Sequence, residues 1–190
     1  MDQARAAKPQ ARIQVWAFDE HRIGLKPIIR RVWAPRGRRP LARSYHRYQW
    51  LYLYGFVHPA SGEVIWFLFN TVNTAAFQAT LEAFAREVGA GPDNTVILVI
   101  DNAGWHVSND IKPPDGVILV FLPPYTPQLQ PAERLWPLAN EAVANRSFED
   151  LADLEEVLAG RCRILCETPA AIRSATLWHW WPNPIAPNES

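Results

Sequence analysis

Cysteines, long apolar runs and signal-like segments are scarce or missing in this chain of 190 residues. Its only two cysteines, Cys162 and Cys166, lie one helical turn apart with no nearby histidine, which argues against a disulfide scaffold and a zinc site. No apolar run approaches the roughly 20 residues that span a bilayer, and the N-terminus leads into no apolar signal core. We therefore expect a soluble, intracellular protein with reduced cysteines in packing roles.

Acidic residues are missing from one long segment. Residues 22–47 contain nine basic residues and no acid, although the whole chain has zero net charge. Eight of the nine are arginines, whose planar guanidinium suits bidentate phosphate contacts. Aromatic residues that could stack on bases or sugars are interleaved with them. The pattern indicates a polyanionic partner, and the alternative is a solvated loop whose arginines pair with acids of the C-terminal half. The candidate DNA-binding residues are Arg30, Arg31, Arg36, Arg38, Arg39, Arg43 and Arg47.

The order of apolar runs predicts one mixed α/β domain. Two of the runs, 13–18 and 96–100, are apolar except for Gln14, as in strands buried on both faces at the centre of a sheet. Two aromatic-rich runs separated by Pro59-Ala60-Ser61-Gly62 predict a hairpin. The expected strands are residues 12–19, 49–58, 63–70, 95–101 and 117–122. The expected helices are one capped by Thr74 that ends near Val88, one from Pro131 to about Ala144, and two that start at Ser147 and Thr168.

Three acids stand where such a sheet usually holds its ligands. Asp19 and Asp101 each follow an apolar run, and Glu133 lies in the first turn of an expected helix. Ligands of open α/β sheets collect at the carboxyl ends of the strands. Converging carboxylates raise one another's pKa unless a divalent cation neutralises them, and oxygen ligands favour Mg²⁺ or Mn²⁺ over zinc. With an arginine-rich surface, two such ions would point to a nuclease or strand transferase.

Four motifs resemble those of the insertion-sequence-630 family of transposases, which is related to the mariner group. The resemblance covers residues 12–160, with the motifs in the family's order. They are Trp16-Ala17-Phe18-Asp19-Glu20, the run from Val32 to Pro40, the run from Val99 to His106, and the run from Leu122 to Trp136.

The resemblance implies a fold, a reaction and partners. The fold is ribonuclease-H-like, a mixed central sheet flanked by helices, and the catalytic and metal-binding triad falls on Asp19, Asp101 and Glu133. Two Mg²⁺ or Mn²⁺ ions would support cutting of double-stranded DNA at transposon ends and strand transfer to a TA target. The implied organisation is an extension at 1–11, the catalytic domain at 12–160, and a C-terminal helix and tail at 161–190. A homodimer and a separately encoded helix-turn-helix subunit are the implied protein partners, with the cytoplasm and bacterial nucleoid as the location.

The chain departs from the family pattern at the helix that carries Glu133. Gln130 replaces an asparagine that would cap this helix better, and Asn140 stands where the family usually has lysine. Pro137 lies where a helix interior is disfavoured. The family's upstream helix-turn-helix domains have no counterpart before the first expected strand, so the chain resembles a catalytic half alone.

Each candidate has a structural alternative. Asp101 could form an Asx turn with Ala103 and Gly104, and Glu133 could be a capping glutamate. Glu20 is a second-shell acceptor or spare metal ligand, or simply the first exposed residue after a strand.

The residues next to the triad also have alternative roles. Asn102 would position Asp101, and His106 would orient water or phosphate or, as a neutral ring, bond a backbone carbonyl. Trp105 and Trp136 are expected in the core, and the alternative is that they are platforms on which bases stack. For the whole chain, the alternatives to a transposase are an inactive DNA-binding remnant and a metal-dependent nuclease that does not transpose.

Overall fold

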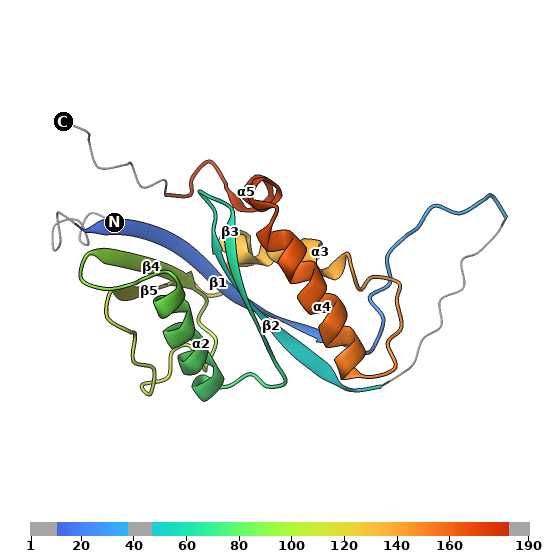
Figure 1. Ribbon diagram of the computed structural model, residues 1–190, viewed down its shortest axis with the longest axis horizontal. Coiled ribbons are helices and arrows are strands. Elements are labelled where there is room, and N and C mark those ends of the chain that lie inside the picture. The colour runs from blue at the N-terminus through green and yellow to red at the C-terminus, as the bar shows by residue number, and fades with distance from the viewer. Residues whose placement is uncertain (1–10, 38–46, 183–190) are drawn as a thin grey trace.

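A mixed five-stranded sheet with the order β3-β2-β1-β4-β5 forms the centre of the molecule (Figure 1). The computed structural model describes residues 11–37 and 47–182. The central strand β1 pairs antiparallel with β2 and parallel with β4, which confirms the expected mixed α/β architecture. The strands are β1 (Arg12–Gly24), β2 (Trp50–His58), β3 (Glu63–Phe69), β4 (Asn94–Ile100) and β5 (Val117–Phe121).

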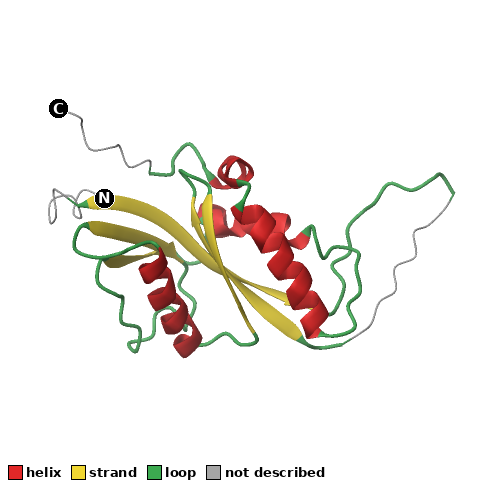
Figure 2. Cartoon of the chain, viewed as in Figure 1, coloured by secondary structure: helices red, strands yellow, loops and turns green. Residues whose placement is uncertain are grey.

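Helices cover both faces of the sheet (Figure 2). Helix α2 lies on one face, and α3, α4 and α5 lie on the other. The helices are α2 (Thr74–Glu87), α3 (Leu135–Asn140), α4 (Leu151–Cys166) and α5 (Pro169–Thr176), with the 3-10 turns η1 (Pro127–Leu129) and η2 (Pro131–Arg134) before α3.

Strand β1 supplies both apolar cores, and this explains why residues 13–18 are apolar except for Gln14. Trp16 and Phe18 belong to the cluster on the α2 face, together with Phe77 of that helix. Val15 and Ala17 belong to the cluster on the opposite face, beneath α4. Successive side chains of a strand point to opposite faces, so a strand covered on both sides is apolar at nearly every position. The exception, Gln14, is buried with hydrogen bonds to Asn94 and Trp16.

The predicted hairpin joins β2 and β3 and is fixed by Gly62. This residue has φ +80°, and a Cβ built there would lie 1.9 Å from the Pro169 carbonyl oxygen. Glycine is required both for the left-handed turn and for the close approach of α5. The Arg173 side chain also donates to the Ala60 carbonyl at 3.0 Å, so the turn and α5 are held together.

Two predictions of where a helix begins were wrong, by one residue for the cap of α2 and by three for that of α4. Asn73, rather than Thr74, caps α2 by accepting the Ala76 N–H at 2.8 Å. Asp150, rather than Ser147, caps α4 by accepting the Asp153 N–H at 3.0 Å. In each case two neighbouring polar residues could act as the cap, and the sequence does not say which one adopts the extended backbone that capping requires.

The predicted continuous helix from Pro131 to about Ala144 was also wrong. The chain forms η2, then the short α3, and then turns through residue 145. Pro137 explains the break, because it has no N–H to bond the Glu133 carbonyl four residues earlier.

The C-terminal helices belong to the same folded unit as the sheet. Helix α4 continues across the expected boundary between residues 160 and 161, and its Leu158 and Cys162 lie in the same core as Val15 of β1. The two cysteines are free, Cys162 buried and Cys166 exposed. Within the described ranges no helix is both long and apolar enough to cross a membrane.

Candidate active site

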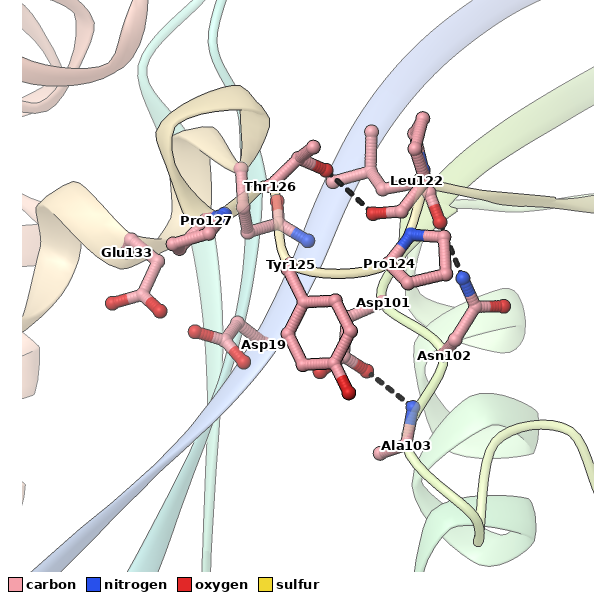
Figure 3. A pocket seen from close by; sticks show the side chains of 12 residues that line it. Asp19, Asp101, Asn102, Ala103, Leu122, Pro124, Tyr125, Thr126, Pro127 and Glu133 are labelled. Carbon is pink, nitrogen blue, oxygen red and sulfur yellow. Dashed lines mark hydrogen bonds between the residues drawn. The ribbon is translucent and has the colours of Figure 1, made fainter.

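The three predicted acids line one pocket of about 470 Å³ (Figure 3). Asp19 comes from β1, Asp101 from the end of β4, and Glu133 from η2. The loop that leaves β5 closes the pocket on another side. Its lining residues are Asp19, Asp101, Asn102, Ala103, Leu122, Pro123, Pro124, Tyr125, Thr126, Pro127, Gln130 and Glu133.

Asp19 lies within β1 rather than at its end, so the predicted strand boundary was wrong. The strand continues to Gly24 because it stays paired with β2, where Gly24 opposes Trp50. Its pairing with β4 stops earlier, at Ala17 opposite Val99. Continued by two residues, this register brings Asp19 beside Asp101, on strands that are typically about 4.8 Å apart. Parallel pairing therefore accounts for the meeting of two acids that are far apart in the sequence.

Asp101 is held by two donors. Its Oδ1 accepts the Ala103 N–H at 3.0 Å and lies 2.6 Å from His106 Nδ1. The first contact is the Asx turn expected as a structural alternative, and it coexists with a place in the pocket. The carboxyl remains half exposed. The hydrogen bond with His106 is the main cause of a lowered pKa at Asp101, so this acid is ionised at neutral pH.

Glu133 is positioned by its neighbour Gln130. The buried Gln130 amide donates to the Phe18 carbonyl at 2.8 Å and accepts the Ala132 N–H at 3.4 Å. Phe18 lies one residue beyond the last β4 partner of β1, which leaves its carbonyl available to this amide. Gln130 thus caps the turn that carries Glu133 and also ties that turn to the backbone just before Asp19. The capping alternative for Glu133 has no support, since its side chain makes no hydrogen bond within residues 11–37 and 47–182.

Burial and mutual repulsion perturb two of the acids. The pKa of Asp19 rises to about 8, first because the carboxyl is buried and then because Glu133 and Glu20 are negative. A hydrogen bond from Trp136 Nε1 to Asp19 Oδ2, at 2.9 Å, acts in the opposite direction. The pKa of Glu133 is also raised, by partial burial and by the charge of Asp101. The folded chain therefore disfavours the ionised forms of Asp19 and Glu133.

A buried histidine joins two acids of different strands. His106 is 1% exposed, and its Nε2 lies 3.2 Å from Glu20 Oε2 while Nδ1 contacts Asp101. Burial lowers its pKa, but the two carboxylates raise it more, to about 9. Glu20 Oε1 also accepts Trp105 Nε1 at 2.8 Å, and its side chain is only 10% exposed. His106 therefore contacts two carboxylates rather than a backbone carbonyl, and Glu20 is not the exposed residue of the alternative.

Asn102 acts on the backbone rather than on Asp101. Its side-chain amide donates to the Leu122 carbonyl, which joins the end of β4 to the loop leaving β5. The expected positioning of Asp101 by Asn102 is therefore indirect, through the loop, while His106 makes the direct contact.

The sequence did not identify the group that holds Asp19. Trp136 is 5% exposed, as expected of a core residue, but its indole N–H donates a hydrogen bond to Asp19. His21 stacks on Trp136 with ring centroids 5.1 Å apart, and its Nε2 lies within 3.1 Å of the Asn140 amide. Asn140, at the position usually occupied by lysine, thus supports the tryptophan that holds Asp19. The spacing of Asp19 and His21 along β1 puts both side chains on one face, so it was an available signal for His21 but not for Trp136.

Four of the seven candidate DNA-binding arginines are described by the structure, and Arg38, Arg39 and Arg43 lie outside the described residues. All four are exposed. Arg30 donates to the Pro137 carbonyl at 3.0 Å, and Arg47 donates to the Glu149 carbonyl. Neither these two nor Arg31 and Arg36 form an ion pair with an acid in the described chain, so pairing with C-terminal acids does not account for them.

The donor set suits a hard divalent cation, although the side chains do not yet enclose one. No three acidic, histidine or cysteine side chains of the described chain stand close enough together to hold a metal ion as they are placed. The three acids nonetheless share one pocket, offer only oxygen, and repel one another, which is the setting in which Mg²⁺ or Mn²⁺ binds.

A protein-family model and one known protein each match most of this chain. The family model for DDE superfamily endonucleases matches residues 14–155. The uncharacterized protein y4pE/y4sA of Sinorhizobium fredii (strain NBRC 101917 / NGR234) is 33% identical over 132 residues, which are 69% of this chain and 96% of that protein.

Solved structures share the fold. The Mos1 transposase paired-end complex with left transposon end matches with a TM-score of 0.55 and 18% identity, over 92% of this chain and 58% of that one. The simian T-cell lymphotropic virus intasome in complex with the PP2A regulatory subunit B56 gamma matches with a TM-score of 0.53 and 10% identity, over 94% of this chain and 60% of that one. This chain thus spans less than two thirds of the length of these two solved chains, and the ribonuclease-H-like fold is confirmed.

Proposed function

Because the chain belongs to the DDE superfamily of endonucleases, we propose that it is a transposase catalytic domain that cuts DNA at transposon ends and transfers the cut strand to target DNA. The observation that carries this proposal is the shared pocket of Asp19, Asp101 and Glu133, at the positions that the family motifs assign to the triad. The bound transposon end of the Mos1 complex supports the choice of double-stranded DNA as substrate.

We assign the metal-binding role to the same three acids. Two Mg²⁺ or Mn²⁺ ions bound there would activate water and stabilise the leaving oxygen of a phosphodiester. The chain's own residues prepare the ligands: Trp136 orients Asp19 by its N–H, and His106 orients Asp101. His106 and Glu20 lie behind the acids rather than among the pocket-lining residues, so we assign them a supporting role.

The arginine segment would hold the DNA backbone. Arg30 and Arg47 each donate a hydrogen bond to a backbone carbonyl of the α3 and α4 region, so they attach the arginine segment to the folded domain. Arg31 and Arg36 remain available for phosphate contacts. We extend the proposed catalytic domain beyond residue 160 to Thr176, since α4 and α5 share the core of β1. A homodimer, a separately encoded helix-turn-helix subunit, a TA target and a location on the bacterial nucleoid complete the proposal.

A plasmid assay tests this function without knowledge of the end sequence. Supercoiled DNA is incubated with the protein and Mn²⁺, and nicked, linear and joined products are separated on a gel. Asp101→Asn is the test variant, and Asp115→Asn, which changes an exposed acid outside the pocket, is its control. We expect cutting by the wild type and the control but not by Asp101→Asn.

Three other outcomes would be informative. Equal cutting by Asp101→Asn would refute the assignment of the site. Cutting without any joined product, even with a cloned transposon end, would identify a nuclease that does not transpose. Absence of both cutting and Mn²⁺-induced stabilisation would identify an inactive remnant.

A further inference from the structure

Tyr125 combines three features that the proposed chemistry does not use. Its backbone is left-handed, with φ 60°. Its side chain is 99% exposed, and it lines the same pocket as Asp19 and Asp101. A left-handed conformation is unfavourable for a bulky residue, and such strain concentrates at functional sites.

Asn145, the other non-glycine residue with positive φ among the described residues, has an ordinary explanation. Asparagine adopts this conformation readily, and the Asn145 side-chain oxygen accepts the Arg30 N–H at 2.8 Å. Tyr125 has no such explanation, because its side chain makes no hydrogen bond, ring contact or ion pair with the described part of the chain. Neither residue type nor packing accounts for its conformation.

Several local constraints hold the loop around Tyr125. Pro123, Pro124 and Pro127 fix their own backbone angles, and the Thr126 hydroxyl donates to the Pro123 carbonyl at 2.6 Å. The contact of Asn102 with the Leu122 carbonyl ties the start of the loop to the end of β4. The loop therefore presents an exposed aromatic ring among the residues that line the pocket (Figure 3).

We propose that Tyr125 is a substrate-binding residue whose ring stacks on a nucleobase next to the phosphodiester that is cut. This inference rests on the proposed function. An exposed ring with both faces free is the type of surface on which bases stack without sequence preference. Since a base inside a duplex has both faces covered, the partner is a base that ends a strand or has left the helix. Tyr125 thus selects DNA with an unstacked base at the cutting site.

Fluorescence of 2-aminopurine tests the stacking directly. The probe is placed either at a 3′ end or as a single-base bulge in a duplex, with Ca²⁺ so that binding is measured before cutting. Tyr125→Phe keeps the ring and removes the hydroxyl, while Tyr125→Leu removes the ring. We expect the wild type and Tyr125→Phe to quench one of the two probes, which identifies the source of the base. Tyr125→Leu should lose the quenching and bind that DNA about tenfold more weakly.

Thermal unfolding separates binding from a structural role. Tyr125→Gly relieves the left-handed backbone, so its Tm should stay within about 2 °C of the wild type or exceed it, while its DNA affinity falls as in Tyr125→Leu. A fall in Tm with unchanged affinity would overturn the proposal. So would equal quenching by the wild type and Tyr125→Leu, or no quenching of either probe by the wild type.

The two proposals can fail independently. If the wild type cuts plasmid DNA but Tyr125→Leu binds and quenches like the wild type, the stacking role alone fails. If the wild type quenches and Tyr125→Leu does not, yet no Mn²⁺-dependent cutting occurs, the stacking role holds and the proposed function fails.

Discussion

Replacing Asp19 by asparagine should stabilise the metal-free protein and abolish its response to metal. The pKa of Asp19 is about 8 in the folded protein and 3.8 in the reference state. The folded state therefore keeps a proton that the unfolded chain releases, and stability present below pH 4 is lost as the pH rises towards 8. The loss is about 1.4 kcal/mol per pH unit, or on the order of 4 kcal/mol at pH 7.

An asparagine at position 19 cannot ionise, so the variant does not lose stability in this way as the pH rises. Its side-chain oxygen can still accept the Trp136 N–H, so the packing around β1 is preserved. At pH 7 the variant should be more stable than the wild type by up to about 4 kcal/mol, which corresponds to roughly 2–4 °C in Tm for each kcal/mol. Near pH 4 the two proteins should unfold alike.

Urea unfolding followed by tryptophan fluorescence, with EDTA, at several values of pH between 4 and 8 measures this difference. Addition of Mn²⁺ at pH 7 should then stabilise the wild type and leave Asp19→Asn unchanged, because the metal binds the ionised acid. Asp115→Asn serves as the control for removing one negative charge outside the pocket. Parallel pH profiles for the wild type and Asp19→Asn would refute the perturbed pKa and the reasoning built on it.

Three further substitutions test the supports of the site. Trp136→Phe removes the hydrogen bond that lowers the pKa of Asp19, so the pH profile of DNA cutting should move to higher pH, with a loss of about tenfold at pH 7. Gln130→Ala leaves the Phe18 carbonyl without its donor and should lower the free energy of unfolding by about 1–3 kcal/mol in urea denaturation. Arg36→Gln should weaken binding to all duplexes equally and reduce the slope of log K against log salt by about one, as measured by fluorescence anisotropy.

The sheet was largely predictable from the sequence because its central strands are covered on both faces. The apolar runs at 13–18 and 96–100 became β1 and β4, and the turn residues before Gly62 became the hairpin between β2 and β3. Helix starts were less predictable, since Asn73 and Asp150 compete with neighbouring polar residues for the cap. The local sequence identifies the candidate cap residues, but tertiary packing determines which of them caps the helix.

The three acids of the site could be predicted from the sequence, whereas the residues that hold them in place could be predicted only in part. Motif positions identified Asp19, Asp101 and Glu133, and the parallel register of β1 and β4 explains why the first two meet. The contact of Trp136 with Asp19 spans 117 positions in the sequence, and no local pattern signals a contact of that range. The backbone strain at Tyr125 is likewise visible only in three dimensions.

Diffraction from a crystal soaked in Mn²⁺, recorded for anomalous scattering, tests the central claim most directly. We predict anomalous density among the carboxylates of Asp19, Asp101 and Glu133, with all three side chains turned towards it, and none there in Asp19→Asn. Density confined to other acids, or an empty pocket at a Mn²⁺ concentration that supports DNA cutting, would contradict the assignment of these three residues as the metal-binding acids.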